Sequence, residues 1–273
     1  MHRRAFIAGA TLLVAAAGRP ARAQAGFDHA HAAWDALLRR HVRLIAAGRA
    51  SQVDYAGIAR ERAALKAYLD TLSAVAPAQY AAWSKPQQFA FLANAYNAFT
   101  VEKILTRYPN LKSIRDFGSV FGNPWKDRFF TLLGKPQHLD GIEHETMRAP
   151  GAFDDPRVHV AVNCASVGCP MLLNRALTAD TLDAQLDDLM QRFMSDRSRN
   201  RYDPAARQLA LSRIFDWYGK DFEQGHRGFR SVADVAARYA DALADTPADR
   251  AALRARTVPI TFLDYDWALN DVR

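Results

Sequence analysis

The sequence predicts a helix-rich α+β domain with a small, mostly antiparallel sheet. Segments with apolar residues at helical spacing are interspersed with short runs of strand-forming residues, each bounded by turn residues. The hydrophobic content of 49% is enough to bury a full core, and no linker rich in glycine, serine or proline divides the chain. We therefore expect one globular domain over residues 24–273.

The first 23 residues have the organisation of an export signal. A positively charged n-region is followed by an apolar run over residues 5–17 and by a cleavage-site motif with small residues at 21–23. The apolar run is shorter than the roughly 20 residues that a membrane-spanning helix needs. We expect residues 1–23 to be a signal peptide, the mature protein to be periplasmic or secreted, and no membrane span to remain. Arg3 and Arg4 resemble a twin-arginine signal, while an ordinary secretory signal remains open.

Removal of this signal changes the charge of the protein. It takes away four of the 36 basic residues and none of the 29 acidic ones, which leaves 32 against 29, a net charge of +3. The remaining basic residues are dispersed, so they give little attraction to nucleic acid or to anionic lipid. We expect no nucleic-acid partner and no cofactor.

The first half of the chain is predicted to be helical. Residues 27–47 form an amphipathic helix, and residues 58–75 form a second one after a short extended piece. Ser84 and Gln87 give the capping-box signal of a third helix, which runs to about residue 108. This helix is apolar on nearly every side, so we expect it to be buried.

The second half is predicted to mix strands with helices. Asp140 and Glu143 give a second capping-box signal, and Thr178 is a candidate cap. In order we expect a hairpin (129–133 with 137–139), a helix from Asp140, a buried strand (158–164), a helix (179–194), a hairpin (202 with 209–211), helices from near Ser212, Ser231 and Thr246, and a strand (258–265).

Cys164 is the strongest candidate for chemistry. A thiol at the end of a buried strand, followed by a turn of small residues, can be presented as a nucleophile beside backbone N–H groups that stabilise an oxyanion. Cys164 and Cys169 are the only cysteines, so a disulfide between them is an alternative in an oxidising compartment. A metal site formed with nearby histidines is a third interpretation.

His144 is the candidate general base. In the first turn of a helix that begins at Asp140, the helix dipole favours the neutral ring that a base needs. The alternative is a packed or partly exposed histidine without a role. Glu143 is either a capping residue or an acidic member of the same site.

Polar groups on the predicted buried helix form another candidate cluster. At 100° per residue, Asn94 lies about 20° and Asn97 about 80° from Gln87 around the helix axis. Because buried amides need partners, they either hold neighbouring loops or orient a catalytic histidine and donate to a substrate carbonyl. Trp125 and residues 264–267 add aromatic and acidic groups that suit core packing or a carbohydrate or peptide cleft.

Several of these stretches occur together in one known family. Residues 88–98, 142–144, 157–170, 215–222 and 265–267 resemble, in order, the domain-of-unknown-function family numbered 547, and the resemblance extends over about residues 53–270. The family pattern includes His144 and Cys164 and accepts serine in place of Cys169, which implies that Cys169 is not essential to the shared function. The resemblance supplies no reaction.

A thiol, an imidazole and side-chain amides suggest papain-like or transglutaminase-like chemistry, and a fold that is in part papain-like or transglutaminase-like. In that chemistry a histidine deprotonates the thiol for attack on an acyl carbon. Here the histidine precedes the cysteine, the reverse of the order in those families, which implies a permuted topology or an independent origin.

We therefore hypothesise an exported, cysteine-dependent acyl-transfer or hydrolytic enzyme that acts on a small-molecule, peptide, amide or cell-envelope substrate. The alternative is a non-enzymatic binding or interaction domain with a structural disulfide. The candidate catalytic residues are Cys164, His144, Asn97, Asn94 and Glu143, and the candidate substrate-binding residues are Asn163, Ser166, His159, Trp125 and Tyr96.

Overall fold

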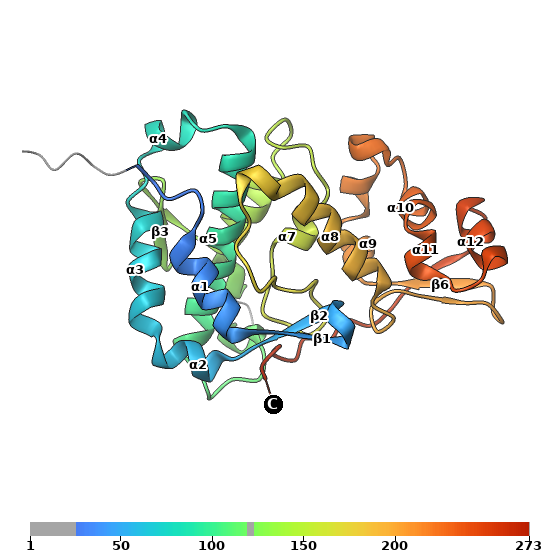
Figure 1. Cartoon of the computed structure of the whole chain (residues 1–273), viewed down its shortest axis with the longest axis horizontal. Coiled ribbons are helices and arrows are strands. Elements are labelled where there is room, and N and C mark those ends of the chain that lie inside the picture. The colour runs from blue at the N-terminus through green and yellow to red at the C-terminus, as the bar shows by residue number, and fades with distance from the viewer. Residues whose placement is uncertain (1–25, 119–122, 273) are drawn as a thin grey trace, which may run out of the picture.

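The computed structural model describes residues 26–118 and 123–272 and has the predicted helix-rich α+β character (Figure 1). The helices are α1 (Ala32–His41), α2 (Tyr55–Arg60), α3 (Arg62–Ser73), α4 (Pro77–Ala81), α5 (Lys85–Leu105), α6 (Leu139–Ile142), α7 (Val158–Ala161), α8 (Leu182–Ser195), α9 (Ile214–Trp217), α10 (Val232–Arg238), α11 (Ala240–Leu243) and α12 (Pro247–Arg254). The strands are β1 (Val42–Ile45), β2 (Ala50–Val53), β3 (Phe130–Leu132), β4 (Lys135–Gln137), β5 (Arg201–Asp203), β6 (Gln208–Leu211) and β7 (Ile260–Phe262).

The strands of residues 26–118 and 123–272 form three small sheets rather than the single sheet that the sequence suggested. The pairs β1–β2, β3–β4 and β5–β6 are antiparallel, and β7 joins β6 in parallel. In Figure 1, helices α1–α4 lie at one end of the molecule beside α5, helices α9–α12 lie at the other end, and α7 and α8 lie between them. Within the described ranges, no helix has the length and apolar character needed to cross a bilayer. The predicted signal peptide, residues 1–23, lies outside those ranges.

Helix α5 is the centre of the core, as predicted. The N–H of Gln87 donates to Ser84 Oγ at 3.4 Å, and the N–H of Ser84 donates to Gln87 Oε1 at 3.0 Å, which completes the expected capping box. Every residue from 89 to 101 is buried. Helices α2, α3 and α6 pack against it, so polar side chains on this helix must find their partners inside the protein.

The first predicted helix is shorter than expected, and the second is divided. Helix α1 ends at His41 because the chain becomes extended and pairs with β2, where Val42 lies opposite Val53. This pairing gives the backbone groups of β1 the hydrogen bonds that a longer helix would have supplied. At Glu61 the backbone leaves helical geometry (φ −106°, ψ 19°), so α2 ends there and α3 begins anew.

The predicted strand over residues 158–164 is wrong. Val158–Ala161 is the short buried helix α7. A short apolar run that is buried on all sides carries no periodicity that distinguishes a strand from a helical turn. The preceding guanidinium of Arg157 holds the start of this helix through three carboxylates, those of Asp155, Asp183 and Asp187, at 2.6, 2.7 and 2.6 Å.

The helix expected to begin at Asp140 begins one residue earlier. Its cap is His138, whose Nδ1 accepts the N–H of Gly141 at 2.9 Å, so the predicted capping box of Asp140 and Glu143 is wrong. Helix α6 continues as a π-helical turn, Glu143–Met147. His144 therefore lies beyond the first turn, where the helix dipole has little effect on a side chain.

The remaining elements follow the predicted order. Both hairpins are confirmed, and the side chains of Ser231 and Thr246 cap α10 and α12. Thr178 precedes a short 3₁₀ turn and makes no capping hydrogen bond to α8. Strand β7 is shorter than the predicted strand 258–265.

Residues 265–272 lie between two distant parts of the chain. The N–H of Val53 donates to the carbonyl of Asn270 at 2.9 Å, which attaches this segment to β2. The N–H groups of Val167 and Gly168 donate to residues 268 and 266, each at 2.8 Å, which attaches it to the turn that follows Cys164. The C-terminal segment accordingly runs close to β1 and β2 in Figure 1.

Candidate active site

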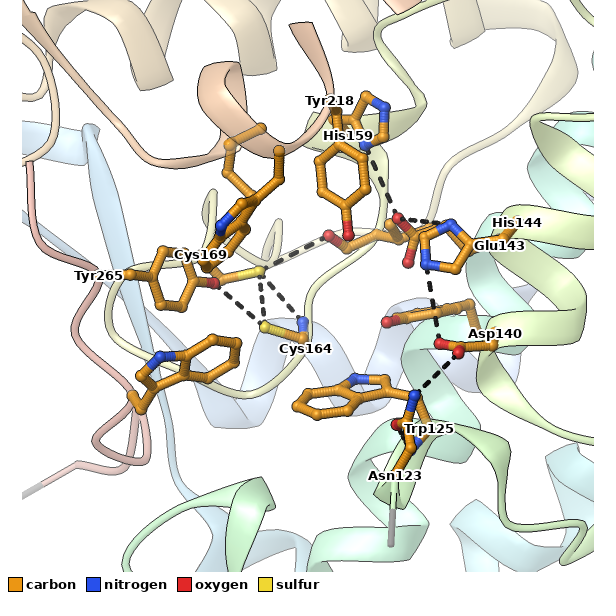
Figure 2. Close-up of a pocket in the computed structure, with 15 residues that line it drawn as sticks. Asn123, Trp125, Asp140, Glu143, His144, His159, Cys164, Cys169, Tyr218 and Tyr265 are labelled. Atoms are coloured by element: carbon orange, nitrogen blue, oxygen red, sulfur yellow. Dashed lines mark hydrogen bonds and ion pairs between the residues drawn. The ribbon is translucent and has the colours of Figure 1, made fainter. Parts of the chain in front are cut away.

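A cavity of about 310 Å³ lies between α6 and the turn that carries the two cysteines (Figure 2). This volume is in the range of small-molecule binding sites. The cavity walls come from α5, from α6 and its π-helical continuation, from α7 and the cysteine turn, from α9, and from residues 265–267. We call residues 163–170 the thiol turn.

Cys164 and Cys169 form one wall of the cavity, and both are free thiols rather than a disulfide. Their sulfurs are 3.2 Å apart, and Cys164 Sγ lies 2.9 Å from Ser166 Oγ and 3.3 Å from the hydroxyl of Tyr265. Hydrogen bonding from Cys169, and then from Ser166 and Tyr265, lowers the pKa of Cys164 to about 7 although burial opposes this. Cys164 is partly exposed, whereas Cys169 is buried. Cys164 is therefore the thiol suited to nucleophilic attack near neutral pH.

The thiol turn is fixed by its own side chains and by the C-terminal segment. Ala165 has a φ of 65°, which is costly for a residue other than glycine. Asn163 offsets this cost, since its Oδ1 accepts the N–H of Ala165 at 3.0 Å and its Nδ2 donates to the carbonyl of Pro170 at 2.7 Å. At Gly168 a Cβ would lie 2.9 Å from the backbone nitrogen of Asp266, so only glycine allows this approach.

The facing wall carries His144, Glu143 and Asp140 (Figure 2). Arg148 Nη1 lies 2.7 Å from His144 Nδ1. Because a guanidinium can only donate, His144 Nδ1 must accept, and the ring proton is then on Nε2, 3.7 Å from Asp140 Oδ1. Burial raises the pKa of Asp140, and the neighbouring Glu143 carboxylate adds to this while His144 opposes it.

His159 is buried behind Glu143. Its Nε2 lies 2.7 Å from Asp221 Oδ2, its Nδ1 lies 3.7 Å from Glu143 Oε1, and its ring stacks on Tyr218 with centroids 4.2 Å apart. Burial raises the pKa of Asp221, but hydrogen bonds from His159 and Arg148 outweigh this and hold it well below its ordinary value. Burial likewise raises the pKa of Glu143, but the combined effect of His159, His144 and Arg148 outweighs it, so that the pKa is lowered. Both carboxylates are therefore ionised at neutral pH.

Neither histidine contacts the thiol. In the part of the chain that the structure describes, the side chains within hydrogen-bond distance of Cys164 Sγ are Cys169, Ser166 and Tyr265. His144 and Cys164 share the cavity from opposite walls (Figure 2). Across residues 26–118 and 123–272, no group of three or more His, Cys, Asp or Glu side chains is arranged to hold a metal ion, so the metal interpretation of the cysteine is not supported.

Aromatic side chains complete the cavity. Tyr96 and Tyr218 line it, and the structure gives their hydroxyls no hydrogen-bond partner among the described residues. Burial raises the pKa of both, so each hydroxyl keeps its proton and can donate to a ligand. The ring centroid of Trp267 lies 5.7 Å from that of Trp217 and 5.8 Å from that of Trp125, which forms an aromatic surface beside the thiols.

Asn94 and Asn97 bind backbone groups behind the cavity wall. The Asn94 amide donates to the carbonyl of Leu177 at 2.7 Å and accepts the N–H of the same residue at 3.1 Å. The Asn97 amide donates to the carbonyl of Ala161 at 2.9 Å and accepts the N–H of Asn163 at 2.8 Å. Neither amide lines the cavity. Of the two roles left open by the sequence, the structure favours the support of neighbouring loops.

The structure brings six of the ten predicted site residues to the cavity. Ser166 contacts the Cys164 sulfur without lining the cavity, and Asn163 fixes the thiol turn from behind, as described above. The six that line the cavity are Cys164, His144, Glu143, His159, Trp125 and Tyr96.

The comparison with protein-family models gives one match for this region. Residues 80–194 match the family described as "Protein of unknown function, DUF547". These residues form a DUF547 domain. The comparisons with curated proteins and with solved structures found no match. The resemblance to this family is confirmed, over a shorter stretch than residues 53–270.

The DUF547 segment contains both thiols, α5, and the wall formed by residues 140–144, but not the whole cavity. Tyr265, which contacts the Cys164 sulfur, and Asp221, which binds His159 and Arg148, lie beyond residue 194. The cavity is therefore built by the DUF547 segment together with the residues that follow it.

Sequence reasoning missed several residues of the site, among them Asp140, Arg148, Tyr218 and Asp221. Asp140 was interpreted as a helix cap, so its position in the cavity wall was not predicted. Tyr218 and Asp221 fall in the family-like motif 215–222, and this was the only sign of their importance. Arg148 had no signal, because its contact with His144 depends on the π-helical turn.

Proposed function

We propose that the protein is a thiol-dependent enzyme that transfers or hydrolyses acyl groups, with Cys164 as the nucleophile. One observation carries this proposal: the Cys164 sulfur reaches a cavity and lies within hydrogen-bond distance of Ser166 and Tyr265, at 2.9 and 3.3 Å. These groups and Cys169 lower the pKa of Cys164 to about 7. A thiolate that forms near neutral pH can attack an acyl carbon.

In this proposal the thiolate is stabilised by hydrogen bonds instead of being formed by an imidazole base. His144 uses Nδ1 to accept from Arg148 at 2.7 Å and directs its Nε2 proton toward Asp140. We therefore assign His144 a positioning role for the Asp140 carboxyl. The feature that we propose to be shared with papain-like or transglutaminase-like proteins is then the acyl chemistry. A partial similarity of fold to these proteins is likewise a proposal.

The proposed reaction has two steps. The Cys164 sulfur bonds to the acyl carbon, and the carbonyl oxygen becomes an oxyanion that accepts from the hydroxyls of Tyr96 and Tyr218. The leaving group departs with a proton from Asp140, whose pKa is raised by burial. Water then attacks the thioester and returns a proton to Asp140, which releases the acid and the thiolate. An amine in place of water gives acyl transfer.

The charge of the cavity favours a neutral or cationic substrate. Among the described residues that line it, Asp140 and Glu143 are carboxylates, and none is lysine or arginine. A substrate with a carboxylate or phosphate would be repelled by Glu143, which has a lowered pKa. The rings of Trp125 and Trp217 offer contact to an apolar or planar group. We propose a peptide, amide or small-molecule substrate, or a component of the cell envelope with this chemistry.

The first test measures the labelling rate of Cys164 with iodoacetamide across a pH series. We expect a midpoint near pH 7, and we expect Tyr265→Phe to move it upward because one hydrogen-bond donor to the thiolate is lost. His144→Ala should change the midpoint less than Tyr265→Phe does, because the ring does not contact the sulfur. A midpoint at the ordinary value for cysteine, unaffected by Tyr265→Phe, would remove the case for an activated thiol.

The second test looks for a covalent acyl-enzyme. Activated esters with neutral, cationic and anionic acyl groups are mixed with the reduced protein, and the acylated residue is found by mass spectrometry. We expect acylation at Cys164, slowest for the anionic ester, and slower deacylation in Asp140→Asn. Glu145→Gln is the matched control, because Glu145 is an exposed carboxylate in the π-helical turn that continues α6 and does not line the cavity. Equal effects of the two variants would contradict the role of Asp140.

A ligand-binding domain without chemistry is the second candidate. The distance of both histidines from the thiol favours it, since no base acts directly on Cys164. In that case Cys164→Ala would bind the ligand as the unaltered protein does, and no acyl-enzyme would form with any ester.

We also propose that the protein acts in the periplasm or outside the cell. The support is the signal-like order of residues 1–23. Sequencing of the N-terminus of the protein isolated from its own host should give Gln24 as the first residue. An intact Met1 in protein recovered from the cytoplasm alone would contradict export.

A further inference from the structure

The two thiols of the cavity differ in access. Both thiols belong to the cavity wall, but Cys164 is partly exposed whereas Cys169 is only 5% exposed. Figure 2 shows the two sulfurs side by side, and they are 3.2 Å apart. A reagent in the cavity reaches Cys164 first, and the nearest group that can react with an adduct on Cys164 is Cys169.

We propose that Cys164 and Cys169 are a redox-active pair, in which Cys164 attacks a disulfide substrate and Cys169 resolves the mixed disulfide. This activity goes beyond the acyl chemistry proposed above and does not depend on it. An accessible attacking thiol with a buried resolving thiol beside it is the arrangement that thiol–disulfide exchange requires.

The reaction balances with a disulfide as the oxidant. The Cys164 thiolate bonds to one sulfur of the substrate, the substrate S–S bond breaks, and its other sulfur leaves as a thiolate. The Cys169 sulfur then bonds to Cys164, and the first substrate sulfur leaves as a second thiolate. The two protons of the cysteines pass to the two leaving thiolates. The cysteine pair loses two electrons, and the substrate disulfide gains them.

The electrostatics of the pair favour this order of events. Burial raises the pKa of Cys169, and the neighbouring Cys164 sulfur raises it further through its hydrogen bond and its charge. A mixed disulfide at Cys164 carries no charge, so the second of these effects disappears after the first step. The backbone N–H of Cys164 lies 3.2 Å from Cys169 Sγ and donates to it, which stabilises the Cys169 thiolate. Cys169 thus becomes a better nucleophile once Cys164 has reacted.

The thiol turn holds the two sulfurs in contact in the reduced state. Asn97 accepts the N–H of Asn163 at 2.8 Å just before Cys164, and Asn163 donates to the carbonyl of Pro170 at 2.7 Å just after Cys169. Both ends of the segment that separates the cysteines are therefore bound to one side-chain network. Such positioning gives the resolving step a high effective concentration of thiol.

The test uses glutathione disulfide as the probe. The reduced protein is incubated with it anaerobically, quenched in acid, treated with N-ethylmaleimide and weighed by mass spectrometry at successive times. We expect the unaltered protein to pass through a transient glutathione adduct, then to lose two hydrogen atoms and both reactive thiols. Dithiothreitol should reverse the change. Cys169→Ser, which keeps a hydrogen-bond donor beside Cys164, should stop at the glutathione adduct.

Cys164→Ser provides the matched comparison, because its remaining thiol is the buried one. We expect a large loss in its rate of adduct formation relative to Cys169→Ser. The proposal is overturned if the unaltered protein keeps a stable adduct as Cys169→Ser does, if Cys164→Ser reacts as fast as Cys169→Ser, or if the oxidised pair resists dithiothreitol in the folded protein. The time course of the unaltered protein is decisive even if a variant fails to fold.

The outcome is separable from that of the proposed acyl chemistry. The labelling profile and the acyl-enzyme assay follow a reaction at the Cys164 sulfur, whereas the loss of two hydrogen atoms requires a reaction of both cysteines. Acylation without disulfide formation would overturn only the redox pair. Disulfide cycling without acylation would contradict only the acyl chemistry.

Discussion

The Asn97 side chain joins the central helix to the thiol turn, since its Oδ1 accepts the backbone N–H of Asn163 at 2.8 Å. Its Nδ2 donates to the carbonyl of Ala161 at 2.9 Å, so one amide fixes the chain on both sides of residue 162. Asn94, one turn earlier on α5, makes the same kind of paired contact with Leu177, away from the cysteines. The two asparagines thus form a natural matched pair.

Asn97→Ala and Asn94→Ala should destabilise the protein by similar amounts. Each leaves a buried donor and a buried acceptor without a partner, which costs about 2–4 kcal/mol in total. Only Asn97→Ala should also slow the alkylation of Cys164, because only Asn97 holds the thiol turn. Urea unfolding and iodoacetamide labelling measure the two effects. An equal loss of labelling in both variants, under conditions where both are folded, would contradict this role of Asn97.

Gly168→Ala should loosen the thiol turn from the C-terminal segment. The added Cβ would lie 2.9 Å from the nitrogen and 3.0 Å from the oxygen of Asp266, and backbone atoms cannot give way easily. We expect a loss of about 1–3 kcal/mol in the free energy of unfolding, and an upward shift of the labelling midpoint of Cys164 because Tyr265 is displaced. Gly26→Ala is the control, since a Cβ there meets no atom within 4 Å. Equal stability of the two variants would show that this contact carries no constraint.

The His144 ring should carry its proton on Nε2. Arg148 occupies Nδ1 as a donor at 2.7 Å, which fixes this tautomer. Nitrogen-15 NMR of the histidine side chains distinguishes the two ring nitrogens. Arg148→Met should release the tautomer and also remove a partner of Asp221, at a cost of about 3 kcal/mol, because that carboxylate is largely buried. A proton found on Nδ1 in the unaltered protein would refute the assignment.

His31 should make the protein sensitive to mild acid. Its Nδ1 lies 2.7 Å from the hydroxyl of Tyr68, and burial lowers the pKa of His31 from 6.5 to about 4. Because the unfolded state then binds the proton more readily, stability is full above pH 6.5 and falls as the pH decreases toward 4. The loss amounts to about 3 kcal/mol. Urea unfolding at several pH values should show this slope, and His31→Gln should flatten it.

His226→Gln provides the control for that measurement, because His226 is not in the buried core. Its pH dependence should match that of the unaltered protein. If His31→Gln keeps the full decline between pH 6.5 and 4, the acid sensitivity has another source.

The parts of the fold that could be predicted have local signals. The capping box of Ser84 and Gln87 lies within one turn of the chain, and it fixed the start of α5 correctly. Ser231 and Thr246 are caps of the same local kind. Strand β1 could not be predicted, because the helix ends where Val42 pairs with Val53. The residues around Val42 contain no local signal of that pairing.

The site could be predicted only as a set of residue types. Cys164, His144 and Glu143 do share one cavity, as their co-occurrence suggested. The contacts that decide their chemistry are non-local: Tyr265 reaches Cys164 across 101 positions of the chain, and Asp221 reaches His159 across 62. No periodicity or spacing rule connects such residues. The expected pairing of imidazole with thiol failed for this reason, since the nearest groups to the sulfur come from the thiol turn and from residue 265.

Because residues 265–272 are attached to the thiol turn, the segment that matches the family model is shorter than the segment that builds the candidate site. A fragment that consists of residues 80–194 alone would contain both cysteines as well as His144 and His159. This fragment would lack Tyr265, whose hydroxyl contacts the Cys164 sulfur, and Asp221, whose carboxylate contacts His159. An inactive excised fragment would therefore say nothing about the reactivity of Cys164 in the longer chain.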